Sequence, residues 1–240
     1  MHVSLFLLAD SELVKVWSRA TPEGQAIIVI LVIFSIFAWS VMAAKALQMR
    51  RATKLNKFFE SEFRGQKQVL DIYDRQLQVP DCPLFVVYQE GSRELDTRLR
   101  AGVVGSGERP RRFVSLKSME HVKRTLERTV AQQSIRLESG LILLAIAVSG
   151  APFLGLLGTV WGVMSAFNYV ANAGKADLAT MAPGVAAALI TTVAGLLVAI
   201  PSMFGYNWLV HNLRVLTVEL DNFAQELVSR METEYLEEKD

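Results

Sequence analysis

Two long stretches of this chain contain no charged side chain. Residues 139–174 and 178–210 have no Asp, Glu, Lys, Arg or His. About 20 apolar residues, each adding about 1.5 Å to a helix, cross the hydrocarbon layer of a bilayer. Each stretch is long enough for that and carries many Gly, Pro, Ser and Thr residues, which favour close helix approach or the lining of a cavity. The chain is therefore predicted to be a membrane protein whose last two spans assemble with other helices.

Reactive and metal-binding side chains are scarce. The single cysteine, Cys82, permits no internal disulfide and no metal cluster, and an inert thiol is expected. An enzyme needs a nucleophile with its base or a set of metal ligands. The histidines lie outside the charge-free stretches, at His2, His121 and His211. We therefore predict that the chain is not an enzyme and needs no cofactor. A small-molecule transporter is also disfavoured, because that class usually has internal repeats and more helices.

Charge is distributed unevenly along the 240 residues. The chain is 51% hydrophobic with a net charge of +1 and a mean hydropathy of +0.28, so membrane and aqueous parts should alternate. Between Lys45 and Glu138 there are 19 Lys and Arg against 12 Asp and Glu, a difference of +7, whereas the tail from Glu219 is acidic.

A third apolar run, residues 26–44, gives the orientation. Its 19 residues span about 28 Å, barely enough to cross a bilayer. Positive charge that flanks a span stays on the cytoplasmic side, which places the N-terminus outside and the C-terminus inside. The basic residues that follow the run are Lys45, Arg50, Arg51, Lys54 and Lys57.

The predicted fold is an all-α membrane protein with three transmembrane helices, long cytoplasmic helical extensions and an N-out/C-in orientation. In chain order we expect a periplasmic segment 1–25, a first span 26–44, a cytoplasmic helical region 45–138, a second span 139–170, a periplasmic loop 171–182, a third span 183–208 and a cytoplasmic helical tail 209–240.

Local patterns add four expectations. With no helix breaker between Phe113 and Ser139, one helix should run from the cytoplasm directly into the second span. Asp81 followed by Pro83 predicts a helix start. Residues 101–112 should form a flexible loop, and the N-terminal segment either a short amphipathic helix on the membrane surface or an unstructured end. The apolar residues of the amphipathic pattern are Leu5, Leu8, Leu13 and Trp17.

Apolar residues continue at helical spacing after the third span. Spacings of three and four residues are typical of a coiled-coil-like seam. The seam either packs on its own chain or joins two subunits, and both arrangements can hold together. Its residues are Leu213, Leu216, Leu220, Phe223 and Leu227.

Small residues form one face on each of the last two spans, and each face contains one hydroxyl. Counted from Pro152 and Pro201, prolines expected to kink the two helices, Thr159 and Thr192 lie at nearly the same depth. The faces are either helix-packing surfaces, with the threonines bonded to their own helices, or the lining of a pore. They comprise Gly155, Thr159, Gly162 and Ala166 on the second span, and Ala188, Thr192, Gly195 and Ala199 on the third.

These two segments resemble a known family. APFLGLLGTVWGVMSAF at residues 151–167 and APGVAAALITTVAGLLVAIPSMFGYN at residues 182–207 are similar to the paired motif of the TolQ/ExbB proton channels, and more distantly to the flagellar stator protein MotA. The FSIFAWSVMAAK region resembles TolQ slightly more than ExbB. MotA has four spans and fits less well.

The resemblance implies a multi-pass protein of the bacterial inner membrane. It implies a homopentamer in which the second and third spans line a pore, with Thr159 and Thr192 at the positions of the family's pore threonines. A single-span TolR/ExbD-type partner would lie inside the pore. The proton-motive force would drive the complex, and a TolA/TonB-type protein would carry the work to the outer membrane.

One position departs from the family pattern. Many relatives have a glutamate where this chain has Ala187. Intramembrane acids cost about 2.5–3.5 kcal/mol at the bilayer centre and mark function where they occur. Since these two spans offer only hydroxyls and backbone, we hypothesise that the partner's helix brings the titrating carboxylate. The alternative is a non-conducting scaffold that uses the same faces only to oligomerise and to anchor partner helices.

Overall fold

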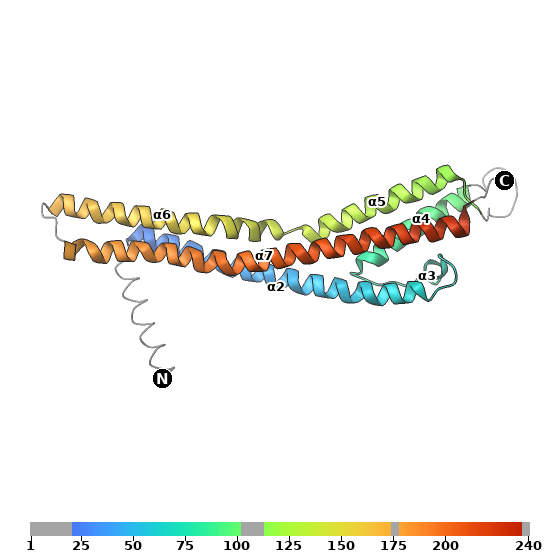
Figure 1. Ribbon diagram of the computed structural model, residues 1–240, viewed down its shortest axis with the longest axis horizontal. Helices are drawn as coiled ribbons and strands as arrows, with labels where there is room; N and C mark the ends of the chain where they lie inside the picture. The colour runs from blue at the N-terminus through green and yellow to red at the C-terminus, as the bar shows by residue number, and fades with distance from the viewer. Residues whose placement is uncertain (1–20, 102–112, 174–177, 237–240) are drawn as a thin grey trace, which may run out of the picture. The chain divides into compact units, whose positions relative to one another are not determined.

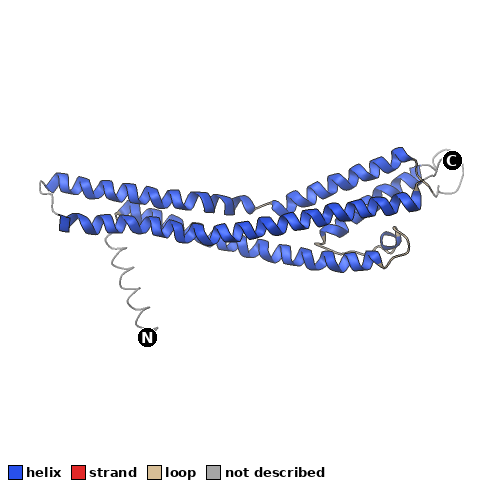
Figure 2. Ribbon diagram, viewed as in Figure 1, coloured by secondary structure: helices blue, strands red, loops and turns tan. Residues whose placement is uncertain are grey.

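The computed structural model describes residues 21–101, 113–173 and 178–236, which are overwhelmingly helical (Figures 1 and 2). Within these ranges the only strand-like pairing is an isolated bridge between Val114 and Leu236, so the predicted all-α class is confirmed. The predicted N-terminal amphipathic helix lies outside the described residues, as does the predicted loop beyond Ala101. The helices are α2 (Pro22–Arg64), α3 (Asp71–Asp74), α4 (Pro83–Ala101), α5 (Leu116–Glu138), α6 (Leu141–Ala173) and α7 (Leu178–Tyr235).

Three of these helices are long and apolar enough to cross a membrane, as the sequence predicted. They are α2, α6 and α7. In all three, no more than a third of the apolar window is buried in the single chain. Helices that are apolar all round are buried in lipid or in other protein, so these surfaces require such a cover.

Backbone contacts divide the chain into two units. The first unit comprises residues 1–44 and 140–208, and the second comprises residues 45–139 and 209–240. The division falls at the residues where the predicted spans meet the predicted cytoplasmic segments. Each unit therefore has its own composition and its own packing.

The first unit joins α2 to α6 and α7 through a small apolar cluster. Ile27 and Leu31 of α2 pack with Ala151 of α6 and Ala199 of α7, and all four side chains are buried. Farther along α2, Met42 lies directly against Gly205 of α7. Large side chains on α2 thus meet small ones on its partners, which keeps the three helices close.

The second unit contains a core of aromatic rings. Phe59 and Phe63 of α2 contact Phe223 of α7 with ring centroids 5.9 and 5.1 Å apart. Phe59 also contacts Phe85 and Tyr88 of α4, at 5.6 and 5.5 Å. Edge-to-face and tilted pairs at such distances are favourable beyond their buried area.

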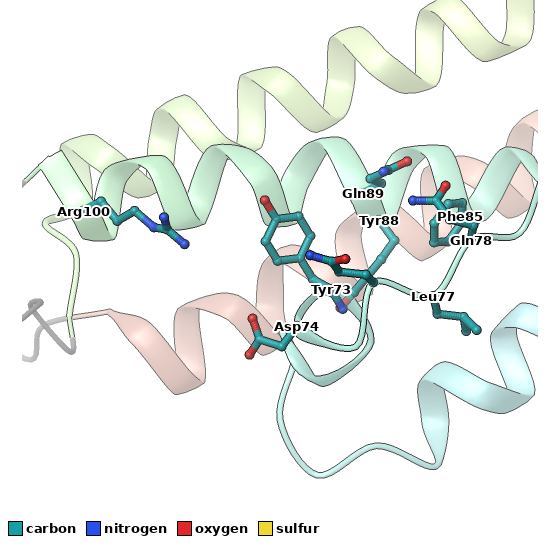
Figure 3. Close-up of a pocket in the computed structure, with 9 residues that line it drawn as sticks. Tyr73, Asp74, Leu77, Gln78, Phe85, Tyr88, Gln89 and Arg100 are labelled. Carbon is teal, nitrogen blue, oxygen red and sulfur yellow. The ribbon is translucent and has the colours of Figure 1, made fainter.

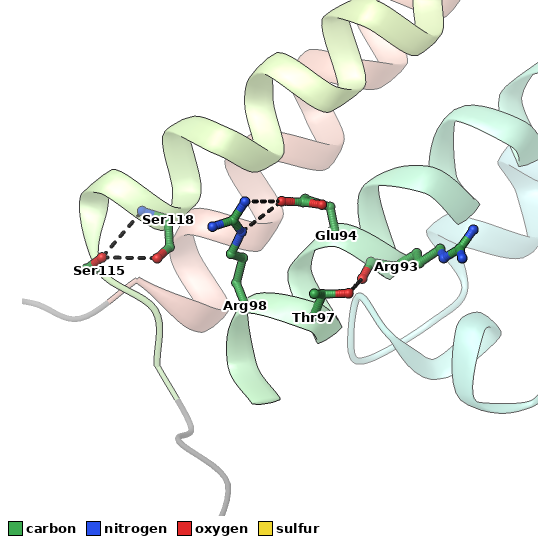
Figure 4. A network of polar contacts seen from close by, with 6 residues as sticks. All are labelled: Arg93, Glu94, Thr97, Arg98, Ser115 and Ser118. Carbon is green, nitrogen blue, oxygen red and sulfur yellow. Dashed lines mark hydrogen bonds and ion pairs between the residues drawn. The ribbon is translucent and has the colours of Figure 1, made fainter. Parts of the chain in front are cut away.

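Helix starts in the second unit are set by polar side chains. α4 begins at Pro83, as predicted, and the buried Asn56 accepts a hydrogen bond from the backbone N–H of Leu84 at 3.3 Å. At the start of α5, the Ser115 hydroxyl accepts from the N–H of Ser118 at 3.3 Å (Figure 4). These side chains satisfy N–H groups that have no partner within the helix.

The predicted continuous helix through Ser139 is wrong. α5 ends at Glu138, α6 begins at Leu141, and Gly140 between them has a φ of 86°. This left-handed conformation is one that glycine adopts without steric cost, so a single glycine ends the helix without a proline. The prediction failed because it did not treat Gly140, which directly follows Ser139, as a helix breaker.

The predicted seam packs on its own chain. Leu216, Leu220, Phe223 and Leu227 are buried within the single chain, and Phe223 contacts the rings of α2. This is the first of the two arrangements that the sequence left open. A contact between subunits stays a prediction.

Candidate functional site

Helices α6 and α7 lie side by side and approach at glycine positions (Figure 1). A Cβ atom added to Gly155 would lie 2.8 Å from the carbonyl oxygen of Thr191, and one added to Gly195 would lie 2.6 Å from that of Ala151. A Cβ on Gly162 would lie 2.6 Å from the side chain of Ala188. The two backbones therefore meet with no room for side chains, which is the small-residue packing that membrane helices use.

The two small-residue faces predicted from the sequence face each other. Gly155 opposes Thr192 and Gly195, and Gly162 opposes Ala188. Farther along the helices, Ala166 lies near Gly184, and Ala199 belongs to the buried cluster with Ala151.

The two predicted threonines meet at the centre of this interface. Thr159 and Thr192 are both half-buried, and their hydroxyl oxygens are hydrogen-bonded to each other. The Thr192 hydroxyl also lies 3.1 Å from the carbonyl oxygen of Gly155. The Thr159 hydroxyl lies 3.3 Å from that same oxygen and 3.4 Å from the carbonyl oxygen of Ala188. This contact places the two hydroxyls at the same level along the paired helices, whereas a pore-lining role stays a prediction.

A third hydroxyl, Thr191, belongs to this cluster. It is 1% exposed and donates toward two carbonyl oxygens, that of Ala188 at 2.7 Å and that of Gly155 at 3.0 Å. Thr191 is absent from the predicted faces because consecutive residues point in different directions on a helix, and of this pair only Thr192 shares the face of Ala188 and Gly195. The consecutive threonines of the ITTVAG segment were the available signal.

The prolines lie inside their helices. Pro152 is within α6, and both Pro201 and Pro183 are within α7. A proline lacks the N–H that would bond to the carbonyl four residues earlier, so Pro152 and Pro201 remove that bond from the carbonyls of Val148 and Leu197. Ser149 and Ser202 lie near these positions but donate to other carbonyls, those of Ala145 at 3.0 Å and Val198 at 2.7 Å.

The chemistry of this interface is limited to neutral oxygens. No ionisable side chain occurs in residues 139–174 or 178–210 apart from tyrosine. Ala187, the position where the resemblance suggests a glutamate in many relatives, carries a methyl group that is buried in the chain. Hydroxyls and carbonyls can accept and relay hydrogen bonds, but neither group binds a proton stably at neutral pH.

The second unit holds a separate pocket of about 500 Å³ (Figure 3). Two of its polar side chains are engaged elsewhere: the Tyr88 hydroxyl donates to the carbonyl of Val69 at 2.7 Å, and Arg100 pairs with Asp96 at 2.9 Å. Burial raises the pKa of Tyr88 above its usual value, so this hydroxyl stays protonated. The described residues that line this pocket include no Ser, Thr, Cys, Lys or His side chain.

Cys82 fits the expected inert thiol. It is fully buried, and burial raises the pKa of its thiol. A raised pKa keeps the thiol protonated at neutral pH, and the protonated form is the unreactive one. The described residues contain no group of three or more His, Cys, Asp or Glu side chains placed to hold a metal ion.

Comparison with known proteins identifies the family. Residues 93–222, which include all of α5, all of α6 and most of α7, match the model of the MotA/TolQ/ExbB proton channel family. The chain belongs to this family. The resemblance found in the two small-residue segments is thereby confirmed.

Individual relatives match along most of their length. The biopolymer transport protein ExbB of Neisseria meningitidis is 28% identical over 216 residues, covering 90% of this chain and 95% of the relative. The Tol-Pal system protein TolQ of Haemophilus influenzae is 30% identical over 231 residues, covering 93% and 95%. TolQ of Pseudomonas aeruginosa is 33% identical over 193 residues, covering 79% of each chain.

Family membership settles two further predictions. The family consists of channel and transducer proteins, so the prediction that the chain is not an enzyme is confirmed. With three helices able to cross a bilayer, the chain is a transmembrane protein of a proton-channel family that transduces energy. TolQ and ExbB relatives both match, so the slight preference for TolQ stays a prediction.

Proposed function

We propose that this chain is the pore-forming subunit of a motor in the bacterial inner membrane that the proton-motive force drives. The motor is of the TolQ–TolR or ExbB–ExbD type and transmits energy to a TolA/TonB-type protein that acts on the outer membrane. Membership of the proton-channel family, with relatives that match over most of the chain, carries this proposal.

The chemistry of the α6–α7 interface supports a role as the wall of a pore rather than as the proton carrier. Thr159, Thr191 and Thr192 bring three hydroxyls together, and the charge-free stretches contain no carboxylate that could take up a proton. A proton crossing hydrocarbon needs a titratable group or a chain of water molecules. A carboxylate on a single-span TolR/ExbD-type partner inside the pore would supply that group.

The proposed assembly is a homopentamer with the N-terminus of each subunit outside and the C-terminus in the cytoplasm. The exposed apolar surfaces of α2, α6 and α7 support it, because lipid, neighbouring subunits and the partner helix would cover them. The basic residues that follow the first span support the orientation.

The division of labour between chain and partner can be tested in proteoliposomes. The full chain is reconstituted alone and with its single-span partner, and proton uptake is followed after an inside-negative potential is imposed. We expect conduction only from the complex. Conduction by the chain alone at the rate of the complex would contradict the division, and a silent complex would contradict the proposed function.

The alternative, a scaffold that does not conduct, is distinguished by Thr192→Val. This change removes one hydroxyl and keeps the shape of the side chain, so the complex should assemble while proton uptake falls at least tenfold. The matched control is Ser149→Ala, which removes an exposed hydroxyl of α6 that donates to its own helix. Equal uptake by complexes that contain the unsubstituted chain, Thr192→Val or Ser149→Ala would mean that the α6–α7 interface takes no part in conduction, which favours the scaffold.

A further inference from the structure

We propose that Thr191 is a positioning residue. Its hydroxyl occupies one of the two backbone carbonyl oxygens that lie within reach of the three threonines. Only one carbonyl acceptor is then left for the hydroxyls of Thr159 and Thr192, and these two hydroxyls therefore bond to each other. The inference deepens the proposed function and rests on it only where proton transfer is concerned.

The number of free acceptors limits the arrangement. In the α-helix, the carbonyls of Gly155 and Ala188 each accept the N–H four residues later, which leaves one lone pair on each oxygen. Gly155 O lies within 3.0–3.3 Å of all three threonine hydroxyls, and Ala188 O within 2.7–3.4 Å of two of them. Three hydroxyl protons thus compete for two lone pairs.

Thr191 donates to one of these lone pairs because its hydroxyl is buried and has no water to bond instead. Thr191 is 1% exposed, and its hydroxyl lies within hydrogen-bond distance of two carbonyl oxygens, of which Ala188 O at 2.7 Å is the nearer. Gly158 provides the room, since a Cβ there would lie 2.7 Å from the Cβ of Thr191. A buried hydroxyl that gave up this bond would have no water to replace the lost acceptor, so Thr191 keeps the bond in preference to the half-buried pair.

The half-buried hydroxyls of Thr159 and Thr192 then have one carbonyl lone pair between them. If Thr191 donates to Ala188 O, only the lone pair on Gly155 O is left, and one threonine donates to it while the other donates to its neighbour. Both orders fit, because the hydroxyls of Thr192 and Thr159 lie 3.1 and 3.3 Å from Gly155 O. In either order both protons are used inside the interface.

The pair consequently presents lone pairs to whatever lies beyond it. A group that meets these oxygens must donate a hydrogen bond, as a protonated carboxyl or a water molecule does. Without the Thr191 hydroxyl, each member of the pair has a carbonyl to itself, Gly155 O for Thr192 and Ala188 O for Thr159. The bond between them is then no longer needed.

A double-mutant cycle on the full chain in detergent tests this coupling. Thermal unfolding is measured for Thr159→Val, Thr192→Val and their combination, once with Thr191 present and once with Thr191→Val. With Thr191 present, the loss for the combination should be smaller than the sum of the single losses, since both changes remove one shared bond. With Thr191→Val the losses should add, and equal non-additivity in both backgrounds would overturn the proposal.

Controls separate positioning from folding. Thr129→Val removes another buried hydroxyl, which donates to the carbonyl of Thr125 within α5 at 2.8 Å, and should leave the coupling of Thr159 and Thr192 unchanged. Thr191→Ser should retain the coupling. If neither Thr191→Val nor Thr191→Ala folds, hydroxyl-proton exchange in the unsubstituted chain decides. Thr191 should exchange more slowly with D₂O than Thr159 and Thr192, and equal rates would overturn the proposal.

Proton uptake by the reconstituted complex gives the functional result. Thr191→Val should reduce uptake about fivefold, the factor that corresponds to one hydrogen bond of about 1 kcal/mol, and Thr191→Ser should restore it. If Thr191→Val abolishes the coupling of Thr159 with Thr192 but leaves proton uptake unchanged, only the claim that Thr191 affects proton transfer is overturned. A complex that conducts no protons would refute the proposed function, while the unfolding cycle would still decide the role of Thr191.

Discussion

The helices within each of the two units pack in different ways, by close backbone contact in the first unit and by large side chains in the second. In the first unit, glycines of α6 and α7 bring the two backbones together, and the buried polar side chains among the described residues, Thr191 and Ser202, donate to backbone carbonyls. In the second unit, large rings such as Phe59 and Phe223 fill the space between helices, and ion pairs such as that of Arg98 with Glu94 lie at its surface (Figure 4).

The difference reflects the solvent for which each unit is built. Water drives large apolar side chains together, so a unit rich in charged residues is stabilised by a bulky core. Lipid provides no such drive between helices, and close backbone packing with hydrogen bonds takes its place. The same chain therefore uses Phe59 in α2 as a core residue, whereas Phe37, earlier in that helix, is 64% exposed.

The largest effect should come from the aromatic core of the second unit. Phe59→Ala removes a fully buried ring that contacts four others and should destabilise the protein by about 3–5 kcal/mol. Denaturant unfolding of the detergent-solubilised chain measures the loss. The matched control is Phe58→Ala, whose ring is 57% exposed. Equal losses for the two changes would break the comparison.

The next effect should come from the glycine contact of the first unit. Gly195→Ala places a Cβ 2.6 Å from the carbonyl oxygen of Ala151, so α6 and α7 must separate, at a cost of about 1–3 kcal/mol. We expect a lower melting temperature and reduced proton uptake by the complex.

Gly150→Ala is the control for this glycine. Among the described residues no atom lies within 4 Å of a Cβ at that position, and alanine favours a helix by about 1 kcal/mol over glycine. Its stability should be unchanged or higher. A stable Gly195→Ala variant would show that the interface is looser than the structure indicates.

A smaller effect is expected at the start of α5. Ser115→Ala removes the side chain that caps the helix and should cost about 1 kcal/mol. Hydrogen exchange of the first-turn amides, including Ser118, should become faster. Lys117→Ala, an exposed change in the same turn, should leave that exchange rate unaltered. Such a result would confirm that local polar contacts matter in the second unit.

The smallest effect should come from a surface ion pair. Arg51 and Asp81 are 3.2 Å apart, but both side chains are more than half exposed. Exposed pairs contribute about 0–1 kcal/mol, so Arg51→Gln should change unfolding by less than the Ser115→Ala variant does. A larger loss would mean that this contact, and not only the ring core, supports the second unit.

The sequence by itself determined the helical class, the three apolar helices and the two small-residue faces of the α6–α7 contact. Long charge-free runs leave few alternatives to a helix that crosses a bilayer, because unpaired backbone groups are too costly in lipid. Regular spacing of small residues likewise specifies one helix face, so Gly155, Gly162 and Gly195 were found without a structure.

Only the tertiary structure decided which neighbours those residues meet. The break at Gly140 depends on a backbone angle, the burial of the Leu216–Phe223 seam depends on contacts with α2, and the part of Thr191 depends on carbonyls from two helices. Periodicity describes one helix at a time. Hydrogen bonds between helices are fixed by their separation and rotation, which the whole fold sets.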